Sequence, residues 1–131
     1  MQDVYIDKDA FVAESSSVGM FSTVRKGSKI GERTSVGSHV CISENVIIGN
    51  DCVIADMVTI CANVEIGDNT FIESGVVFAE KLNQRAKDDI TPPKTHVGNN
   101  VSIHSRAVIE AGSTIEDNTL IDYGEIISLQ K

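Results

Sequence analysis

The sequence has few of the large side chains that fill a wide core, and it has few bases. Its 131 residues include no tryptophan, and aromatic residues make up only 5% of the chain. That composition suits a narrow interior. Eleven lysines and arginines stand against nineteen acids, which gives a formal net charge of −8. This shortage of bases argues against nucleic-acid binding, which needs a basic face, and against an anionic lipid surface.

Long apolar runs and paired cysteines are also missing. No apolar run approaches the ~20 residues of a membrane span, and the start lacks the basic-then-apolar pattern of a signal peptide. We therefore expect a soluble, cytoplasmic protein with one domain over residues 1–131. Three cysteines without a CxxC spacing predict free thiols rather than a disulfide framework or a structural metal site; they are Cys41, Cys52 and Cys61.

What the sequence does have is a strict six-residue period. An isoleucine or valine opens each six-residue unit, or hexad, and eighteen such openers can be counted. They are Ile6, Val12, Val18, Val24, Ile30, Val36, Ile42, Ile48, Ile54, Ile60, Ile66, Ile72, Val97, Ile103, Ile109, Ile115, Ile121 and Ile127. No helix repeats every six residues, and a fixed hexapeptide period is typical of a parallel β-helix. Three hexads per coil predict six coils and a prism ~29 Å tall.

Each position of the hexad has a predicted place. The β-branched opener points inward and stacks on the next coil. The fifth residue is also inward but small, as at Ser22, Thr34 and Val58. The fourth residue makes the turn and is often Gly, Asn, Asp or His, which tolerate a positive φ. Four asparagines, Asn45, Asn63, Asn100 and Asn118, fall at the fourth position of every third hexad, so we expect one structural amide ladder at one corner.

The period breaks once, over residues 78–96, which read FAEKLNQRAKDDITPPKTH. In a tight solenoid an excursion this long is usually functional and often marks the binding face. It concentrates four of the eleven basic residues of an acidic chain, so it could meet an anionic ligand. The alternative is a surface loop that only decorates the coil.

Two segments resemble a known family. GNNVSIHSRAVIEAGSTIEDNTLI (98–121) is similar to the rung pattern of the hexapeptide-repeat acyltransferases, which fold as left-handed β-helices. VVFAEKLNQRA (76–86) is similar to the VFTN-x-x-NPRA stretch of enzymes that N-acetylate amino groups of nucleotide-linked sugars, with Phe78, Asn83, Arg85 and Ala86 coinciding.

The resemblance implies a fold, partners and a reaction. It implies an all-β, left-handed parallel β-helix that forms a homotrimer, with acetyl-CoA bound between neighbouring prisms and the loop shaping that cleft. It also implies that the amine of a nucleotide-linked sugar, a precursor of a cell-surface polysaccharide or glycan, attacks the thioester directly. Such a reaction needs proximity, a proton acceptor and donors for the oxyanion.

The sequence departs from the family in three places. The family's Gln-Asn-Asn run corresponds to Ala55-Asp56-Met57, and its Thr-Asn after the phenylalanine corresponds to Ala79-Glu80. The chain also stops at Lys131, where family members usually continue into a Pro-rich turn and a cap. The first two departures indicate a different substrate or a lost activity. The third indicates a minimal version of the family, a shortened chain or a domain of a larger chain.

Three residues are candidates for catalysis. His96 ends the loop just before the prism resumes. Asp56 lies where the family has its polar run, and could act as a base or orient the amine. His39 lies at a turn, directly below Met57. Each also has a structural interpretation, as an exposed turn carboxylate for Asp56 and as tolerated turn or surface residues for the histidines.

Six residues are candidates for binding the cosubstrate acetyl-CoA. Phe78, Asn83 and Arg85 coincide with the family's loop motif. Lys94 and Arg106 could meet the phosphates of coenzyme A, or be solvated surface charges. His104 lies at the second position of its hexad, on a coil above the loop.

Two other functions remain open at this point. The altered residues could mark a catalytically impaired trimer with a binding or assembly role. A γ-type carbonic anhydrase uses the same fold, but it needs three histidine ligands for zinc, and the spacing of His39, His96 and His104 differs from that family's.

Overall fold

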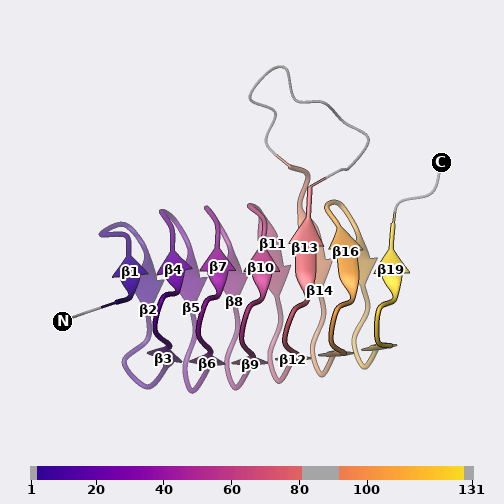
Figure 1. Ribbon diagram of the computed structural model, residues 1–131, viewed down its shortest axis with the longest axis horizontal. Coiled ribbons are helices and arrows are strands. Elements are labelled where there is room, and N and C mark those ends of the chain that lie inside the picture. The colour runs from indigo at the N-terminus through magenta and orange to yellow at the C-terminus, as the bar shows by residue number, and fades with distance from the viewer. Residues whose placement is uncertain (1–2, 81–91, 129–131) are drawn as a thin grey trace.

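A computed structural model describes residues 3–80 and 92–128 and contains only strands and turns (Figure 1). The chain winds as a left-handed parallel β-helix with three flat faces. The predicted fold class is therefore confirmed. No helix of the described residues is long and apolar enough to cross a membrane.

Each face is one parallel sheet, named here in chain order. Face 1 consists of β1 (Tyr5–Ile6), β4 (Thr23–Val24), β7 (Cys41–Ile42), β10 (Thr59–Ile60), β13 (Val77–Ala79), β16 (Val108–Glu110) and β19 (Ile126–Ile127). Face 2 consists of β2 (Phe11–Val12), β5 (Lys29–Ile30), β8 (Ile47–Ile48), β11 (Val64–Ile66), β14 (Thr95–Val97) and β17 (Thr114–Ile115). Face 3 consists of β3 (Ser17–Val18), β6 (Ser35–Val36), β9 (Val53–Ile54), β12 (Phe71–Ile72), β15 (Ser102–Ile103) and β18 (Leu120–Ile121).

The core is the stack of hexad openers inside the prism. From Val24 to Ile121 every opener is buried, and Ile60 is 0% exposed. The small fifth residues share this interior, and the hydroxyls among them form hydrogen bonds with backbone groups of the turns. Ser22 Oγ, for example, donates to the carbonyl of Gly37 at 2.8 Å and accepts from the amide of Val40 at 3.0 Å. Buried turn groups therefore find partners without breaking the apolar stack.

The predicted register is wrong at one point, the break in the repeat. Phe78 is itself a hexad opener, paired with Ile60 below and Ile109 above and only 1% exposed. Val97 therefore opens the next hexad on face 2. The predicted loop of 78–96 is correspondingly shorter, because β13 ends at Ala79 and β14 begins at Thr95. An aromatic residue stands where the period otherwise places isoleucine or valine, which hid the strand.

The same shift of one hexad separates the predicted asparagine ladder into two. Each corner of the prism is named by the two faces that it joins, so corner 1–2 is the turn by which the chain passes from face 1 to face 2. Asn45 and Asn63 lie at corner 1–2, where the amide of Asn63 donates to Glu44 O. Asn100 and Asn118 lie at corner 2–3, where the amide of Asn100 donates to Asp68 O. All four have φ near +60°, so the structural reason for asparagine at these turns holds.

Candidate functional site

The sequence-predicted site residues lie at two separate edges of the prism. The insertion leaves the prism at corner 1–2, between β13 and β14 (Figure 1). Near this corner lie Phe78, Lys94 and His96, and Asn83 and Arg85 fall within the insertion, outside the described residues. The other group lies at corner 3–1, and comprises His39, Asp56, His104 and Arg106.

At corner 1–2 the described contacts hold the root of the insertion to face 2. Asn63 Nδ2 donates to the carbonyl of Pro92 at 2.9 Å, and Lys94 Nζ pairs with Glu65 Oε2 at 2.9 Å. His96 Nδ1 lies 3.5 Å from Glu65 Oε1. Lys94, and to a smaller extent His96, hold the pKa of Glu65 below its usual value, although partial burial opposes them. This group of charges lies on the outer surface of face 2, beside the root of the insertion.

Two of the predicted residues here are poorly placed for an anionic ligand. Phe78 is a core residue, so its side chain lies in the prism and not on a surface cleft. His96 faces out from β14 into a hollow of about 350 Å³ whose lining includes Glu116 and Asp117. The carboxylates of Glu116 and Asp117 in that hollow would repel an anionic ligand placed beside His96.

Corner 3–1 differs between its lower and upper halves. One residue with positive φ turns the chain there in each coil, and these residues stack as Phe21, His39, Met57, Gly75, Arg106 and Gly124. In the lower half, large side chains fill the corner. The rings of Phe21 and His39 stack with centroids 5.1 Å apart. Met57 lies above His39, as predicted, and His39 contributes to this packed column.

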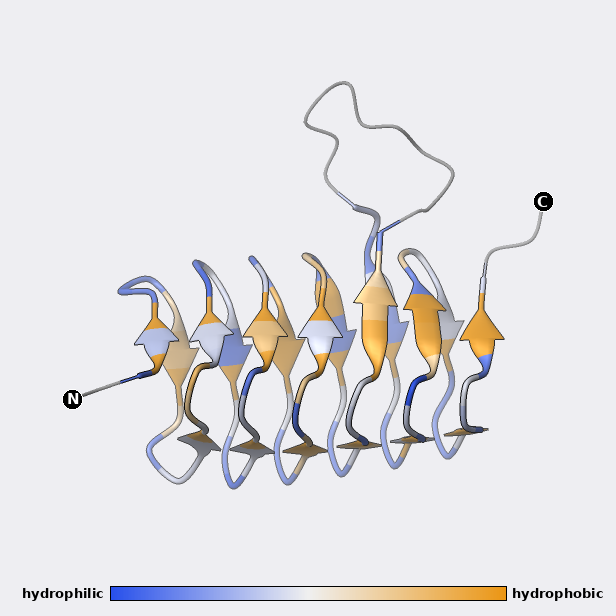
Figure 2. Ribbon diagram, viewed as in Figure 1, coloured by the Kyte–Doolittle hydropathy of each residue, from blue (hydrophilic) through white to orange (hydrophobic). Residues whose placement is uncertain are grey.

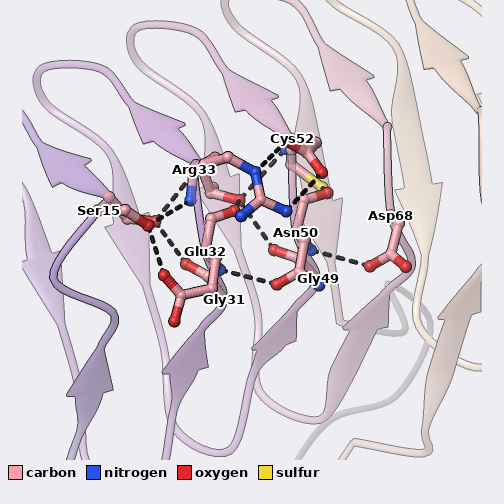
Figure 3. Close-up of polar contacts among 11 residues, drawn as sticks. Ser15, Gly31, Glu32, Arg33, Gly49, Asn50, Cys52 and Asp68 are labelled. Atoms are coloured by element: carbon pink, nitrogen blue, oxygen red, sulfur yellow. Dashed lines mark hydrogen bonds and ion pairs between the residues drawn. The ribbon is translucent and has the colours of Figure 1, made fainter.

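Asp56 has a structural contact at this corner. Its Oδ1 accepts a hydrogen bond from the amide of Ser38, one coil below, at 2.9 Å. The same contact recurs at corner 2–3, where Asn50 and Asp68 cap the amides of Glu32 and Asn50 (Figure 3). In each case a glycine lies beneath the side chain, and a Cβ on Gly37 would collide with Asp56 Oδ1. This hydrogen bond supports the interpretation of Asp56 as a structural turn carboxylate.

In the upper half, corner 3–1 is hollow. A cavity of about 400 Å³, called the corner pocket here, is lined by Met57, Ser74, Gly75, Ser105, Arg106, Tyr123 and Gly124. The hollow exists because two of the stacked turn residues are glycines. A Cβ on Gly124 would meet nothing within 4 Å, and a Cβ on Gly75 would meet only Arg106, at 3.7 Å and beyond.

Arg106 contributes a positive charge to this pocket. Another arginine, Arg33, occupies the corresponding turn position at corner 2–3, and Asp51 in the next coil neutralises it at 2.8 and 3.1 Å (Figure 3). Arg106 has glycine both below and above it, and within the described part of the chain no carboxylate pairs with it. An arginine beside a cavity and without a partner is suited to bind an anion, because its guanidinium matches phosphate or carboxylate geometry.

His104 lies two residues before Arg106 and is held by a carboxylate. Its Nδ1 is buried and lies 3.0 Å from Glu73 Oε2, within the distance of an ion pair, and has no hydrogen-bond partner among the described residues. The other oxygen of Glu73 accepts from the amide and the hydroxyl of Ser105, at 3.0 and 3.1 Å. The ring of Tyr123 covers His104, with centroids 4.4 Å apart and planes 12° apart.

The contacts of Glu73 determine its ionisation. Its contact with His104 lowers its pKa most, the two hydrogen bonds from Ser105 add to this effect, and desolvation opposes it. Glu73 is therefore a carboxylate at neutral pH, facing one nitrogen of the imidazole. This arrangement of a histidine oriented by a carboxylate is one that enzymes use for proton transfer.

The sequence reasoning missed Glu73, Tyr123 and the glycines of the corner pocket. Ile72 pairs with Ile103, which places Glu73 directly below His104. The two residues would have been recognised as neighbours if Phe78 had been counted as an opener. Within the described residues no group of three or more His, Cys, Asp or Glu side chains could hold a metal ion. Of the three histidines, His96 lies on face 2, and the other two lie at corner 3–1 three coils apart.

Comparison with known proteins identifies the repeat. Residues 45–80 match the family model described as bacterial transferase hexapeptide (six repeats). No curated protein matches the sequence.

Several solved structures share the fold at low sequence identity. A variant of perosamine N-acetyltransferase from Caulobacter crescentus, in complex with coenzyme A and GDP-perosamine, is 15% identical with a TM-score of 0.69, covering 88% of this chain and 52% of that one. The acetyltransferase domain of PglB from Neisseria gonorrhoeae, with acetyl coenzyme A, is 19% identical (TM-score 0.56; 90% and 53%). A UDP-N-acetylglucosamine O-acyltransferase from Moraxella catarrhalis is also 19% identical (TM-score 0.54; 95% and 65%). The chain spans about half the length of the first two.

Proposed function

We propose that this chain, which carries the bacterial transferase hexapeptide repeat on a left-handed β-helix, is an acetyl-CoA-dependent N-acetyltransferase. Its acceptor is the amino group of a nucleotide-linked sugar. Two of the structures that share its fold hold coenzyme A or acetyl coenzyme A, and one of them also holds GDP-perosamine, which supports this choice of substrates. The proposed place of the reaction is the cytoplasm.

The observation that carries the proposal is the corner pocket with its unpaired arginine. Both proposed substrates are phosphate esters, and Arg106 supplies the charge that a phosphate needs in a protein of net charge −8. The pocket's serines add hydroxyls, and the exposed ring of Tyr123 adds a flat apolar surface.

The position of Arg106 favours the nucleotide-linked sugar as its ligand. In coenzyme A the whole pantetheine arm separates the phosphates from the thioester. In a nucleotide-linked sugar only the sugar ring separates the diphosphate from the amine. His104, which has the geometry of a proton acceptor, is two residues from Arg106, and this short separation suits the sugar. We therefore place the diphosphate at Arg106 and the acyl donor near the insertion, whose sequence contains Arg85.

The proposed active unit is a homotrimer. The insertion and the corner pocket lie at different edges of one prism, so they form one site only when the insertion of one protomer meets the pocket of another. The outward residues of β13, β16 and β19, namely Val77, Val108 and Ile126, make this part of face 1 apolar and suited to packing (Figure 2). Light scattering tests this assembly, and a mass near that of the 14.1 kDa chain would contradict it.

The test is turnover of acetyl-CoA with a panel of nucleotide-linked amino sugars. We expect release of free coenzyme A that depends on the sugar. Arg106→Gln should weaken binding of the sugar by about one to two decades, since a charge-assisted hydrogen bond contributes about 1.5–3 kcal/mol. Arg33→Gln is the matched control, because Arg33 also stands at a positive-φ turn but lies at corner 2–3.

A protein with only a binding role is distinguished in the same experiment. It would be stabilised by coenzyme A, by about 2.7 kcal/mol at 100 times the Kd, yet release none from acetyl-CoA with any sugar. That result would overturn the proposed activity.

A further inference from the structure

We propose that the ring of Tyr123 is the surface on which the nucleobase of the sugar nucleotide stacks, and that the corner pocket accepts different bases because stacking is its main contact with the base. This inference rests on the proposed function, and names how the site recognises the nucleotide part of its substrate. Tyr123 lines the corner pocket together with Arg106, where the diphosphate is placed.

The first support is the exposure of Tyr123 beside a cavity. Tyr123 is 65% exposed although it is a large aromatic residue, and the pocket that it lines has a volume of about 400 Å³. Pockets that hold small molecules have volumes of ~300–1,000 Å³. The corner pocket can therefore admit a planar ring in addition to phosphate groups.

The second support is that contacts within the protein fix the ring. One face of Tyr123 stacks on His104, with centroids 4.4 Å apart and planes 12° apart, and across the described residues no ring stacks on the other face. The amide of Tyr123 donates to Asp122 Oδ1 at 2.7 Å, and the amide of Gly124 donates to the carbonyl of Ser105 at 3.1 Å. The turn that carries the ring is thus held to the coil below. A ring that is already held loses little conformational entropy when a base stacks on it.

The third support is the relation of Tyr123 to Arg106. Gly124, which follows Tyr123 in the chain, stacks above Arg106 at corner 3–1. In a nucleoside diphosphate only the ribose separates the base from the phosphates. A base on Tyr123 is therefore compatible with a diphosphate at Arg106. Coenzyme A also carries a base, adenine, but the proposed function places that molecule near the insertion, at corner 1–2.

The tolerance for different bases follows from the side chains around the pocket. No amide or carboxylate side chain is present among the described residues that line it, and the neutral polar ones are Ser74 and Ser105. A serine hydroxyl can donate or accept a hydrogen bond, so it does not distinguish the edge of uracil from that of guanine. Stacking on an aromatic ring is also tolerant, because every base has a π-face.

Calorimetric titration of the wild-type protein with UDP, GDP and methyl diphosphate tests the inference. Methyl diphosphate keeps the diphosphate ester and lacks the base. UDP and GDP should bind about 5- to 150-fold more tightly than methyl diphosphate, the usual contribution of a base stacked on an aromatic side chain. The affinities for UDP and GDP should agree within a few-fold.

Three variants assign this difference to the ring. Tyr123→Leu removes the ring, and should weaken binding of UDP and GDP by about 5- to 150-fold while binding of methyl diphosphate stays unchanged. Tyr123→Phe keeps the ring and should retain the affinity for both. Phe21→Leu is the control, because Phe21 also stacks on a histidine at corner 3–1 but lies in the filled lower half, away from the pocket.

A spectroscopic test needs no change at Tyr123. The chain has two tyrosines, so Tyr5→Phe leaves Tyr123 as the one tyrosine ring. In that variant UDP should shift the ring-proton NMR resonances of Tyr123, and methyl diphosphate should leave them in place. This measurement decides the matter if Tyr123→Leu does not fold.

The outcomes are distinct. A wild-type protein that binds UDP and GDP, together with a Tyr123→Leu variant that binds them equally well, overturns this inference and leaves the proposed function standing. An equal loss of methyl diphosphate binding in Tyr123→Leu also overturns it, since the ring would then only shape the pocket. UDP and GDP affinities that differ by more than a few-fold overturn the tolerance for different bases.

Titration with coenzyme A distinguishes the two sources of a base. Tyr123→Leu should bind coenzyme A as the wild-type protein does. A loss of coenzyme A binding, with UDP and GDP binding unchanged, would assign the ring to adenine and overturn the inference. A wild-type protein that binds none of the diphosphates and releases no coenzyme A with any sugar overturns the proposed function itself, and this inference with it.

Discussion

At the scale of single residues, the molecule is built from pairs that lie one coil apart. A glycine at the second position of a hexad leaves room for the aspartate or asparagine at the third position of the coil above. That side chain in turn caps an amide in the coil below. Asp68 is an example, since it lies over Gly49 and accepts from the amide of Asn50 at 2.8 Å. Each polar side chain therefore satisfies a backbone donor that the turn leaves open.

This pairing makes Gly37 and Asp56 energetically coupled. Gly37→Ala should lower the free energy of unfolding by about 1–3 kcal/mol, because the added methyl collides with the Asp56 carboxylate. The cost should be smaller in an Asp56→Ala background, since the nearest remaining atoms are backbone atoms of residues 55 and 56 at 3.0 Å. Urea denaturation of both singles and the double variant measures the coupling, and strictly additive effects would contradict it.

The three thiols differ in exposure, and this predicts their reactivity. Cys52 and Cys61 are buried, and burial, with Glu80 adding to it, raises the pKa of Cys61 to about 11. Cys41 faces outward on β7 and is partly exposed. A thiol reagent at pH 8 should therefore label one cysteine of the folded protein quickly and the other two only on unfolding. Fast labelling in a Cys41→Ser variant would contradict the burial of the other two.

Three carboxylates predict how stability depends on pH. Arg33 lowers the pKa of Asp51, Lys94 that of Glu65, and His104 that of Glu73. A pKa that folding lowers contributes stability that is present above the unfolded value, 4.5 for a glutamate, and lost as the pH falls through the folded value. Tm should therefore fall steadily below about pH 4.5. The fall in Tm should be smaller in Arg33→Gln. An equal fall would show that the Arg33–Asp51 pair does not contribute to the pH dependence of stability.

At the scale of the strand, stability comes from stacking and not from length. Most strands have two residues, and the one that points inward is buried in the shared core of the stacked coils. Ile60→Asp should unfold the protein, since it places a charge without a partner in an apolar stack. Thr59→Asp is the matched control, because Thr59 is the outward neighbour on the same strand and should leave Tm within a few degrees. A folded Ile60→Asp variant would contradict the assigned register.

The strands also show what the sequence could predict. The hexad period is a local signal that repeats in every coil, so the fold class and the buried openers followed from it directly. The strand at Phe78 did not, because its opener is aromatic and lies beside the insertion. That error moved every later hexad by one face. Contacts between coils on the two sides of the insertion, such as that of Glu73 with His104, therefore could not be predicted from the sequence.

At the scale of the whole molecule, the three faces close the sides of the prism. Burial of the inward residues increases along the described coils, from Ile6, which is 42% exposed, to Val24, which is 0% exposed. The corner pocket is likewise a property of several coils together, since it needs Met57, Gly75, Arg106 and Gly124 from four successive turns. No local sequence pattern predicts such a cavity, and Arg106 is the one residue of its lining that the sequence analysis proposed as a binding residue.

The central claim is that the corner pocket is where the phosphates of a sugar nucleotide bind. Calorimetric titration with UDP and GDP, which carry the diphosphate of such sugars, tests it in the wild-type protein and in Gly75→Asn. Asparagine already stands at five turn positions of this chain with φ between 55° and 64°, so it fits the backbone at Gly75 while its side chain fills the hollow. Asn69→Gly, the reverse change at the neighbouring corner of the same coil, is the control.

We predict that the wild-type protein and Asn69→Gly bind at least one of the two diphosphates with similar affinity, and that Gly75→Asn binds it at least about tenfold more weakly, a loss of about 1.4 kcal/mol. Equal affinity in Gly75→Asn and the wild-type protein, or no binding of either diphosphate to the wild-type protein, would contradict the account.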